Sequence, residues 1–175
     1  MSQSLHSALV PPLVRNLLNL SHLLKRADAH AEANGYPASV LLSSRLYPDM
    51  FDLTRQVQIS TDISRRGVAR LAGREAPSME DNETELSELL DRISRSIAFI
   101  ESVPPEEFNG AEQREIKLPI PSTMGGGERI FQGEDFLRSF VLPNVYFHVT
   151  TAFAILRHNG VPIGKFDYLL GEEAP

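Results

Sequence analysis

Leucine and isoleucine recur at three- and four-residue steps in several long stretches of this 175-residue chain, and this pattern limits the folds that it can form. This spacing places apolar side chains on one face of an α-helix, and that face must be buried against another element. We expect the first helix to end at Asn34-Gly35, and Pro11-Pro12 either to start it or to kink a longer helix that begins near Ser4. Its apolar residues are Leu13, Leu17, Leu20 and Leu24.

A second helix is predicted over residues 49–72. Pro48-Asp49 is favourable at a helix start, because the N–H that proline lacks has no partner there, and Gly73 is suited to the position after a helix end. The face that points inward is unusually polar for a core. It consists of Leu53, Val57, Ser60, Ser64 and Leu71.

A third helix is predicted to begin at Ser78, which with Asp81 resembles a capping box, and to end at Pro104-Pro105. Acidic residues gather at this start, and such a group is usually a solvated surface. They are Asp81, Glu83, Glu85 and Glu88. The apolar face comprises Leu86, Leu89, Leu90, Ile93, Ile97 and Ile100.

Two short segments, residues 115–118 and 129–132, have the pattern of a small β-hairpin with Gly125-Gly126-Gly127 in its turn. No Gly-Lys-Ser/Thr follows these glycines, so they do not indicate a phosphate-binding loop. A fourth helix is predicted from about Glu134 to His158. The chain is therefore expected to be all-α: a single four-helix-bundle domain over residues 1–175, with a hairpin excursion between helices three and four.

Composition excludes several classes of function. The chain has no cysteine, which removes disulfides, thiolate nucleophiles and cysteine-ligated zinc. Its net charge of -6, without a basic run, argues against a nucleic-acid-binding protein. The N-terminal residues 1–16 do not resemble a signal peptide, and no uninterrupted run of about 18 apolar residues suggests a membrane span. A cytoplasmic protein is therefore expected.

Polar side chains interrupt the apolar face of the fourth helix. At about 100° per residue, Asn144, His148 and Thr151 lie on the same face as Leu137 and Ile155. Buried polar groups need partners, and the i, i+4 spacing of Asn144 and His148 allows both to reach one ion. The sequence leaves two interpretations open: a metal site, or a structural histidine that hydrogen-bonds to Asn144, Gln56 or a buried water.

The opposite face of this helix is apolar as well, so it must also be covered. A homodimer formed partly through the fourth helix would cover it, and so would Phe131 together with residues 163–170 of the same chain. The residues of this face are Val145, Val149, Phe153 and Leu156. On the first helix, His22 and His30 lie away from the leucine face and are expected to be solvated.

Several stretches together resemble a known family. They are Arg-Leu-Tyr-Pro-Asp-Met at residues 45–50, Leu-Pro-Asn-Val-Tyr-Phe-His at residues 142–148 and Leu-Arg-His-Asn-Gly-Val at residues 156–161. The chain is similar to an uncharacterised bacterial and fungal family of unknown function within the DinB/YfiT-like metalloenzyme superfamily. The resemblance implies a four-helix bundle that is often dimeric. In better-known members a metal is held by one histidine of helix two and by an H-x-x-x-H on helix four.

This chain departs from that ligand pattern. Counting back from Leu156-Arg157, the second histidine of the motif falls on His148, whereas the first is replaced by Asn144. The second helix has no histidine, and Gln56 is the best candidate for that place, followed by Asp52. Such a set suits zinc or nickel poorly. A polar binding pocket is expected instead, and its residues are Asn144, His148, Thr151, Gln56, Asp52 and Ser60.

Three hypotheses about function follow. In the first, the protein is dimeric, its metal site has degenerated, and it binds a small ligand or is associated with stress. In the second, it is a metal- or thiol-dependent transferase, isomerase or hydrolase, in which His148 is the base or the single strong ligand of zinc or nickel and Asn144 orients it. In the third, the polar residues only fix the register of the core.

Overall fold

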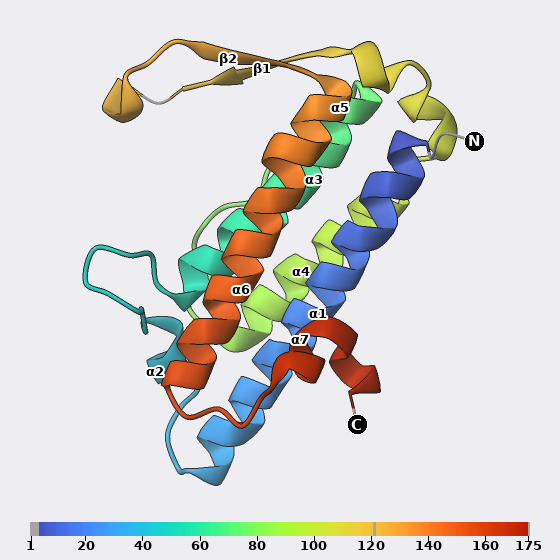
Figure 1. The fold of residues 1–175 in the computed structure, drawn as a ribbon. Helices are drawn as coiled ribbons and strands as arrows, with labels where there is room; N and C mark the ends of the chain where they lie inside the picture. The colour runs from blue at the N-terminus through green and yellow to red at the C-terminus, as the bar shows by residue number, and fades with distance from the viewer. Residues whose placement is uncertain (1–3, 121, 175) are drawn as a thin grey trace.

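The computed structural model describes residues 4–120 and 122–174, and it confirms the four-helix bundle with a small hairpin. The bundle helices are α1 (Leu5–Ala33), α3 (Leu53–Ala72), α4 (Leu86–Glu101) and α6 (Leu142–His158), which run side by side (Figure 1). The short helix α2 (Ser39–Leu42) joins α1 to α3. The four predicted leucines of α1 are fully buried and form much of the core.

Helix α1 begins after Ser4, whose hydroxyl accepts a hydrogen bond from the Ser7 N–H at 3.2 Å. Both prolines of the Pro11-Pro12 pair lie inside this helix, so the longer of the two predicted helices is the one that forms. The helix ends at Asn34, and Gly35 follows with a φ of 72°, a conformation in which glycine carries no steric cost.

Helix α3 begins later than predicted, because Asp52 and not Pro48 precedes its first turn. The Asp52 carboxylate accepts a hydrogen bond from the Arg55 N–H at 2.9 Å, which caps the helix. Residues 47–50 form a turn instead. The predicted end at Gly73 is confirmed, with a φ of 72°, and the five residues of the predicted inner face are all buried.

Helix α4 also begins later than predicted, so the expectation of a start at Ser78 is wrong. Its cap is a capping box formed by Glu85 and Glu88, in which the Glu88 carboxylate accepts hydrogen bonds from the N–H groups of Thr84 at 2.7 Å and Glu85 at 3.0 Å. The preceding residues, which we call the 74–85 segment, form no helix and lie against α3 and α4.

The predicted hairpin is present as β1 (Glu115–Pro119) and β2 (Glu128–Gln132), paired antiparallel with Ile116 opposite Phe131. It projects from one end of the bundle (Figure 1). Residues 125–127 lie in its turn, where all three glycines have positive φ.

The last bundle helix is continuous from α5 (Gly133–Asp135) through a π-helical segment (Phe136–Val141) into α6. Gly67 of α3 packs against it, because a Cβ at this glycine would lie 2.8 Å from Val141 Cγ1. Contrary to expectation, this 26-residue helix is long and apolar enough to span a membrane, because its most apolar 18-residue window has a mean hydropathy of 1.4. In the structure 44% of that window is buried inside the protein, and a core helix of a bundle can be equally apolar.

The C-terminal helix α7 (Lys165–Leu170) and the turn Gly171–Glu173 lie across α1 (Figure 1). His22 contacts the Asp167 carboxylate at 2.9 Å and its side chain is only 14% exposed, so the expectation that it is solvated is wrong. His30 is half-buried and meets the edge of Tyr36, which corrects the same expectation there.

Candidate functional site

The buried polar residues predicted on the second and fourth helices meet where α3 packs against α6. Gln56 is 2% exposed and His148 is 9% exposed. His148 Nδ1 lies 2.7 Å from Gln56 Oε1, which is one of the hydrogen bonds that the sequence left open. The pair joins two helices that are distant in the sequence, and it forms the centre of the candidate site.

The hydrogen bonds of Gln56 fix the protonation of His148. Gln56 Nε2 donates to the Phe51 carbonyl at 3.1 Å, which turns Oε1 toward the imidazole. Because an amide oxygen can only accept, His148 Nδ1 must carry the proton. In the neutral ring the lone pair is then on Nε2, and among the described residues no group donates a hydrogen bond to it.

The electrostatic surroundings keep this imidazole neutral. Burial lowers the pKa of His148 below its ordinary value, and the nearby positive charge of Arg55 lowers it further. The partner of Nδ1 is an uncharged amide and not a carboxylate, so nothing at that nitrogen compensates an imidazolium charge. At neutral pH the ring therefore presents a hydrogen-bond acceptor.

The other predicted polar residues of the two helices bond to their own backbone. Asn144 Nδ2 donates to the Phe140 carbonyl at 2.6 Å, so this side chain does not orient His148. The hydroxyl of Thr151 donates to the Phe147 carbonyl at 2.7 Å. Ser60 donates in the same way to a backbone carbonyl one turn earlier, at 2.9 Å. These groups are satisfied locally, so Gln56 and not Asn144 positions the imidazole.

Asp52 belongs to the edge of the site. Besides capping α3, its carboxylate receives a hydrogen bond from Arg45 at 3.3 Å. Asp52 lines a cavity of about 550 Å³ together with Phe51 and Arg55. Neither Gln56 nor His148 is among its lining residues.

Two exposed aromatic residues are linked to the pair. The ring of Phe147 meets the His148 imidazole edge-on, with 5.2 Å between centroids, and Phe147 is 59% exposed. Phe51, which supplies the carbonyl that holds Gln56, is 56% exposed. A small molecule bound at the imidazole would therefore have the exposed ring of Phe147 beside it.

The metal that the family resemblance implies does not fit these residues. Gln56 Oε1 is occupied by His148 Nδ1, and Asn144, whose Nδ2 is bonded to the Phe140 carbonyl, offers only an amide oxygen, a poor ligand for zinc or nickel. Only His148 Nε2 remains as a strong ligand, and structural or catalytic zinc sites have at least three protein ligands. Among residues 4–120 and 122–174, no group of three histidine, aspartate or glutamate side chains could hold a metal ion.

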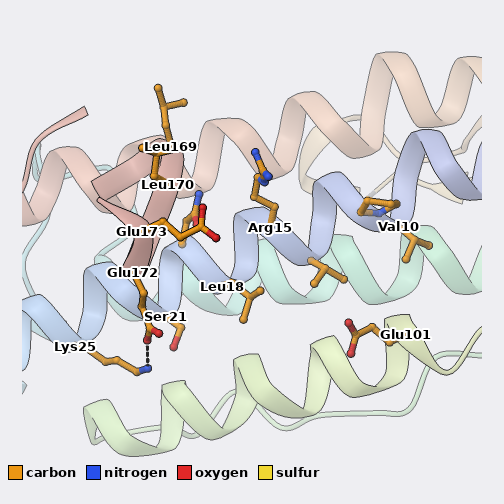
Figure 2. Close-up of a pocket in the computed structure, with 13 residues that line it drawn as sticks. Val10, Arg15, Leu18, Ser21, Lys25, Glu101, Leu169, Leu170, Glu172 and Glu173 are labelled. Carbon is orange, nitrogen blue, oxygen red and sulfur yellow. Dashed lines mark hydrogen bonds and ion pairs between the residues drawn. The ribbon is translucent and has the colours of Figure 1, made fainter. Parts of the chain in front are cut away.

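A larger cavity, of about 650 Å³, lies on the other side of the bundle between α1, α4 and the C-terminal elements. Figure 2 shows Leu18 on α1, Leu169 and Leu170 on α7, and the Lys25–Glu172 ion pair of 2.6 Å at one end. None of the predicted site residues lines it. On the sequence, its only signal is Leu18, an extra leucine beside the buried face of the helix.

The second apolar face of α6 is covered within one chain. Val145, Val149 and Leu156 are fully buried, and Phe153 packs edge-on against Tyr168 with 6.0 Å between centroids. Phe131 packs on Phe136 and Phe140 of the preceding segment. The intrachain alternative therefore accounts for these residues, whereas Tyr146 on the same helix stays 40% exposed.

A buried ion network between α3, α4 and the 74–85 segment was missed by sequence reasoning. Arg92 is fully buried and contacts the carboxylates of Glu83 at 2.8 Å, Asp62 at 2.7 Å and Asp81 at 2.9 Å. The Glu83 side chain is only 6% exposed, which corrects the expectation of a solvated acidic face. The signal for this network was Arg92 itself, because it interrupts the apolar face of α4.

Comparisons with known proteins agree with this architecture. Residues 5–169 match the family described as a domain of unknown function, DUF1993. The structure is similar to the crystal structure of a DinB family member protein from Shewanella denitrificans, with a TM-score of 0.85 and 40% sequence identity over 94% of this chain and 91% of the other. No curated protein matches the chain.

Proposed function

Because this chain belongs to the DUF1993 family of DinB-like domains, for which no activity is known, we propose its function from the site that its own residues form. The protein binds a small neutral molecule through a hydrogen bond to His148 Nε2, without a metal. The observation that supports this proposal is the chain of hydrogen bonds from the Phe51 carbonyl through Gln56 to His148 Nδ1. It leaves one acceptor atom in an otherwise satisfied buried cluster.

The chemistry of the site selects the ligand class. An unprotonated Nε2 accepts a hydrogen bond, so the ligand must supply a donor such as a hydroxyl, an amide or an amine N–H. The exposed rings of Phe51 and Phe147 favour a ligand with an apolar or aromatic part. Arg55 lowers the pKa of His148 through its positive charge, and the same charge disfavours a cationic ligand.

A second candidate is an enzyme in which His148 Nε2 acts as general base in a transferase, isomerase or hydrolase reaction. The lone pair on Nε2 favours this role, because it could take a proton from a bound hydroxyl or thiol. The imidazolium so formed would face Arg55 and have only a neutral amide on Nδ1. Since the site does not stabilise that charge, ligand binding ranks above base catalysis.

Two further properties belong to the proposal. The protein is a homodimer, with the exposed Tyr146 of α6 at the interface, and it is cytoplasmic. Tyr146→Glu would place a charge in such an interface and is expected to turn dimer into monomer in sedimentation. A wild-type chain that sediments as a monomer at high concentration contradicts the homodimer.

The binding proposal can be tested with two simple probes, phenol and anisole. Phenol has an aromatic ring and an O–H donor, whereas anisole has the ring without the donor. Amide chemical shifts are followed by NMR while each probe is added to wild-type protein. The same titrations are made on His148→Phe, and on His158→Phe as a matched control at the exposed end of α6.

Phenol is expected to shift amides around Gln56 and His148 in the wild type and in the His158 variant, and anisole to bind more weakly. His148→Phe should remove the difference between the two probes. Equal binding of phenol and anisole to the wild type would contradict the hydrogen bond. About one zinc or nickel per chain, found by elemental mass spectrometry of protein purified without chelators or nickel resin, would contradict the metal-free site.

A further inference from the structure

The C-terminal half of α3 presents arginines on one side of the helix. Arg66 and Arg70 are four residues apart and therefore neighbours on the helix surface, and Arg74 follows just beyond the helix end. All three line a cavity of about 380 Å³. Its other wall is formed by the first residues of the 74–85 segment, including Glu75 and Ser78.

The three arginines differ in their partners. Arg66 contacts the Asp62 carboxylate at 3.0 Å, and Arg74 pairs with Glu107. Arg70 is half-buried, and in the described part of the chain its guanidinium makes no hydrogen bond and no ion pair. Burial lowers the pKa of Arg70, and the charge of Arg66 lowers it further. A desolvated cation beside a second cation is unfavourable unless an anion joins them.

The cavity wall is fixed by interactions that do not involve Arg70. The buried Arg65 donates to the Pro77 carbonyl, which ties the segment to α3. At the helix end, the Arg74 N–H donates to the Ala69 carbonyl at 2.8 Å, after Gly73 has turned the chain. The space in front of Arg70 is therefore formed by the fold and does not require a ligand to create it.

We propose that Arg70 and Arg66 bind a small oxyanion of the phosphate class in this cavity. A guanidinium presents its N–H donors in a planar fork that matches two oxygens of a phosphate group. Arg70 is the principal ligand because it has no other partner, and Arg66 is shared with Asp62. The anion is either inorganic phosphate or the phosphate group of a small metabolite, and its site is separate from His148.

Glu75 gives the proposal a second consequence. Glu75 lines the same cavity, so the negative charge of its side chain disfavours an anion bound there. Replacing it by glutamine keeps the size of the side chain and removes the charge. Glu75→Gln is therefore expected to strengthen phosphate binding, whereas a loss of binding would be expected if the variant only damaged the cavity.

The test measures the affinity for inorganic phosphate by NMR titration, with sodium chloride added to keep the ionic strength constant. Arg70→Gln is compared with Arg15→Gln, which removes the same charge from an exposed arginine that has no ion pair among the described residues. Circular dichroism checks that both variants are folded. A parallel titration with adenosine monophosphate distinguishes free phosphate from the phosphate group of a larger molecule.

Saturable binding of phosphate to the wild type is expected, with amide shifts concentrated in residues 66–78. Arg70→Gln should weaken binding by about tenfold or more, as expected for the loss of a charge-assisted hydrogen bond, and Arg15→Gln should leave it within about twofold. The proposal is overturned if phosphate causes no saturable shift, or if the two variants weaken binding equally. Tighter binding of adenosine monophosphate than of phosphate identifies a metabolite as the ligand.

Discussion

Helix α3 buries polar side chains on two faces, and the two faces differ in how these groups are satisfied. The side toward α4 and the 74–85 segment, which we call the charged face, carries Asp62 and Arg65. The Asp62 carboxylate contacts both Arg65 and the buried Arg92 of α4. The side toward α6, which we call the neutral face, carries the uncharged amide of Gln56, which is hydrogen-bonded to the neutral imidazole of His148. Both clusters hold two helices together, but they use different chemistry.

On the charged face nearly all buried polar atoms have a hydrogen-bond or ion-pair partner. Arg92 donates from Nε to Thr61 at 2.9 Å, and from its two terminal nitrogens to Glu83 and Asp62. Among the buried side-chain atoms there, Arg65 Nε lacks a partner. On the neutral face a lone pair remains on His148 Nε2. The comparison indicates that the charged network is structural, whereas the neutral pair has capacity left for a ligand.

The largest effect is expected from breaking the charged face with Arg92→Met. This change leaves the buried Glu83 without its counter-charge, whereas Asp62 keeps its contact with Arg65. The loss of one partner of a buried ion pair costs about 3–5 kcal/mol. The free energy of unfolding is measured by urea denaturation. Arg95→Met, which removes an exposed i, i+4 ion pair of the same helix, is the matched control and should cost less than about 1 kcal/mol. Equal losses in the two variants would show that the network is not structural.

The neutral face is broken by Gln56→Leu, with a smaller expected effect. The substitution leaves His148 Nδ1 buried without an acceptor, which costs about 1–3 kcal/mol. Gln56→Glu sharpens the comparison, because a carboxylate at Nδ1 would stabilise the imidazolium and raise the pKa of His148. An NMR titration of the imidazole measures this pKa. If it did not rise in Gln56→Glu, the assigned contact between the two side chains would be wrong.

The two faces should also lose stability in different pH ranges. The pKa of His148 is lowered on folding, so the unfolded chain binds more protons and stability falls as the pH drops below about 6.5, by up to about 1.4 kcal/mol per pH unit. For Glu83, burial raises the pKa, but the hydrogen bonds from Arg92 and Gln58 outweigh it and the pKa lies below its ordinary value. Ionised Glu83 therefore contributes to the free energy of unfolding above the pKa that it has in the unfolded chain. This contribution is lost at a lower pH than the contribution of neutral His148. In His148→Gln the free energy of unfolding should no longer fall between pH 6.5 and 5, whereas the loss at lower pH should remain. If the variant and the wild type showed the same pH dependence between pH 5 and 6.5, the neutral imidazole would be contradicted.

The smallest effect is expected at Asn144. Among the described residues its amide bonds only to the backbone carbonyl of Phe140 on the same continuous helix, and the residue is half-buried. Asn144→Ala should change the unfolding free energy by no more than about 0.5 kcal/mol and leave the pKa of His148 unchanged. A change in that pKa would restore Asn144 to the site.

The fold was predictable wherever local rules decide it. The leucine and isoleucine repeats placed α1 and α4, and Gly35 and Gly73 marked the ends of α1 and α3 correctly. The start of α4 was missed because Ser78 and Asp81 satisfy a local capping pattern, whereas Glu85 and Glu88 form the actual cap. What holds Asp81 away from a helix is its contact with Arg92, and helical periodicity contains no information about such a partner.

The site was predictable only in outline. The helical stripe placed His148 on a buried face. Gln56 came from the family resemblance, as the residue in the place of the second-helix histidine, and not from the 3.6-residue repeat. Which polar groups bond to each other did not follow. Asn144 and Gln56 were both within reach of the imidazole, and the backbone carbonyl of Phe140 took the first, leaving Gln56 for His148.

The proposed function requires that His148 carries its proton on Nδ1 and keeps Nε2 free to accept a hydrogen bond. The most direct test is a long-range ¹H–¹⁵N NMR spectrum of the histidine rings at pH 7.5, with His148→Gln used to assign the signals. We predict one ring with a protonated Nδ1 and an unprotonated Nε2, and this ring becomes charged only below the ordinary pKa of a histidine. A signal from the Nε2-protonated tautomer, or a ring already charged at pH 7.5, would contradict the proposed acceptor and with it the account of the site.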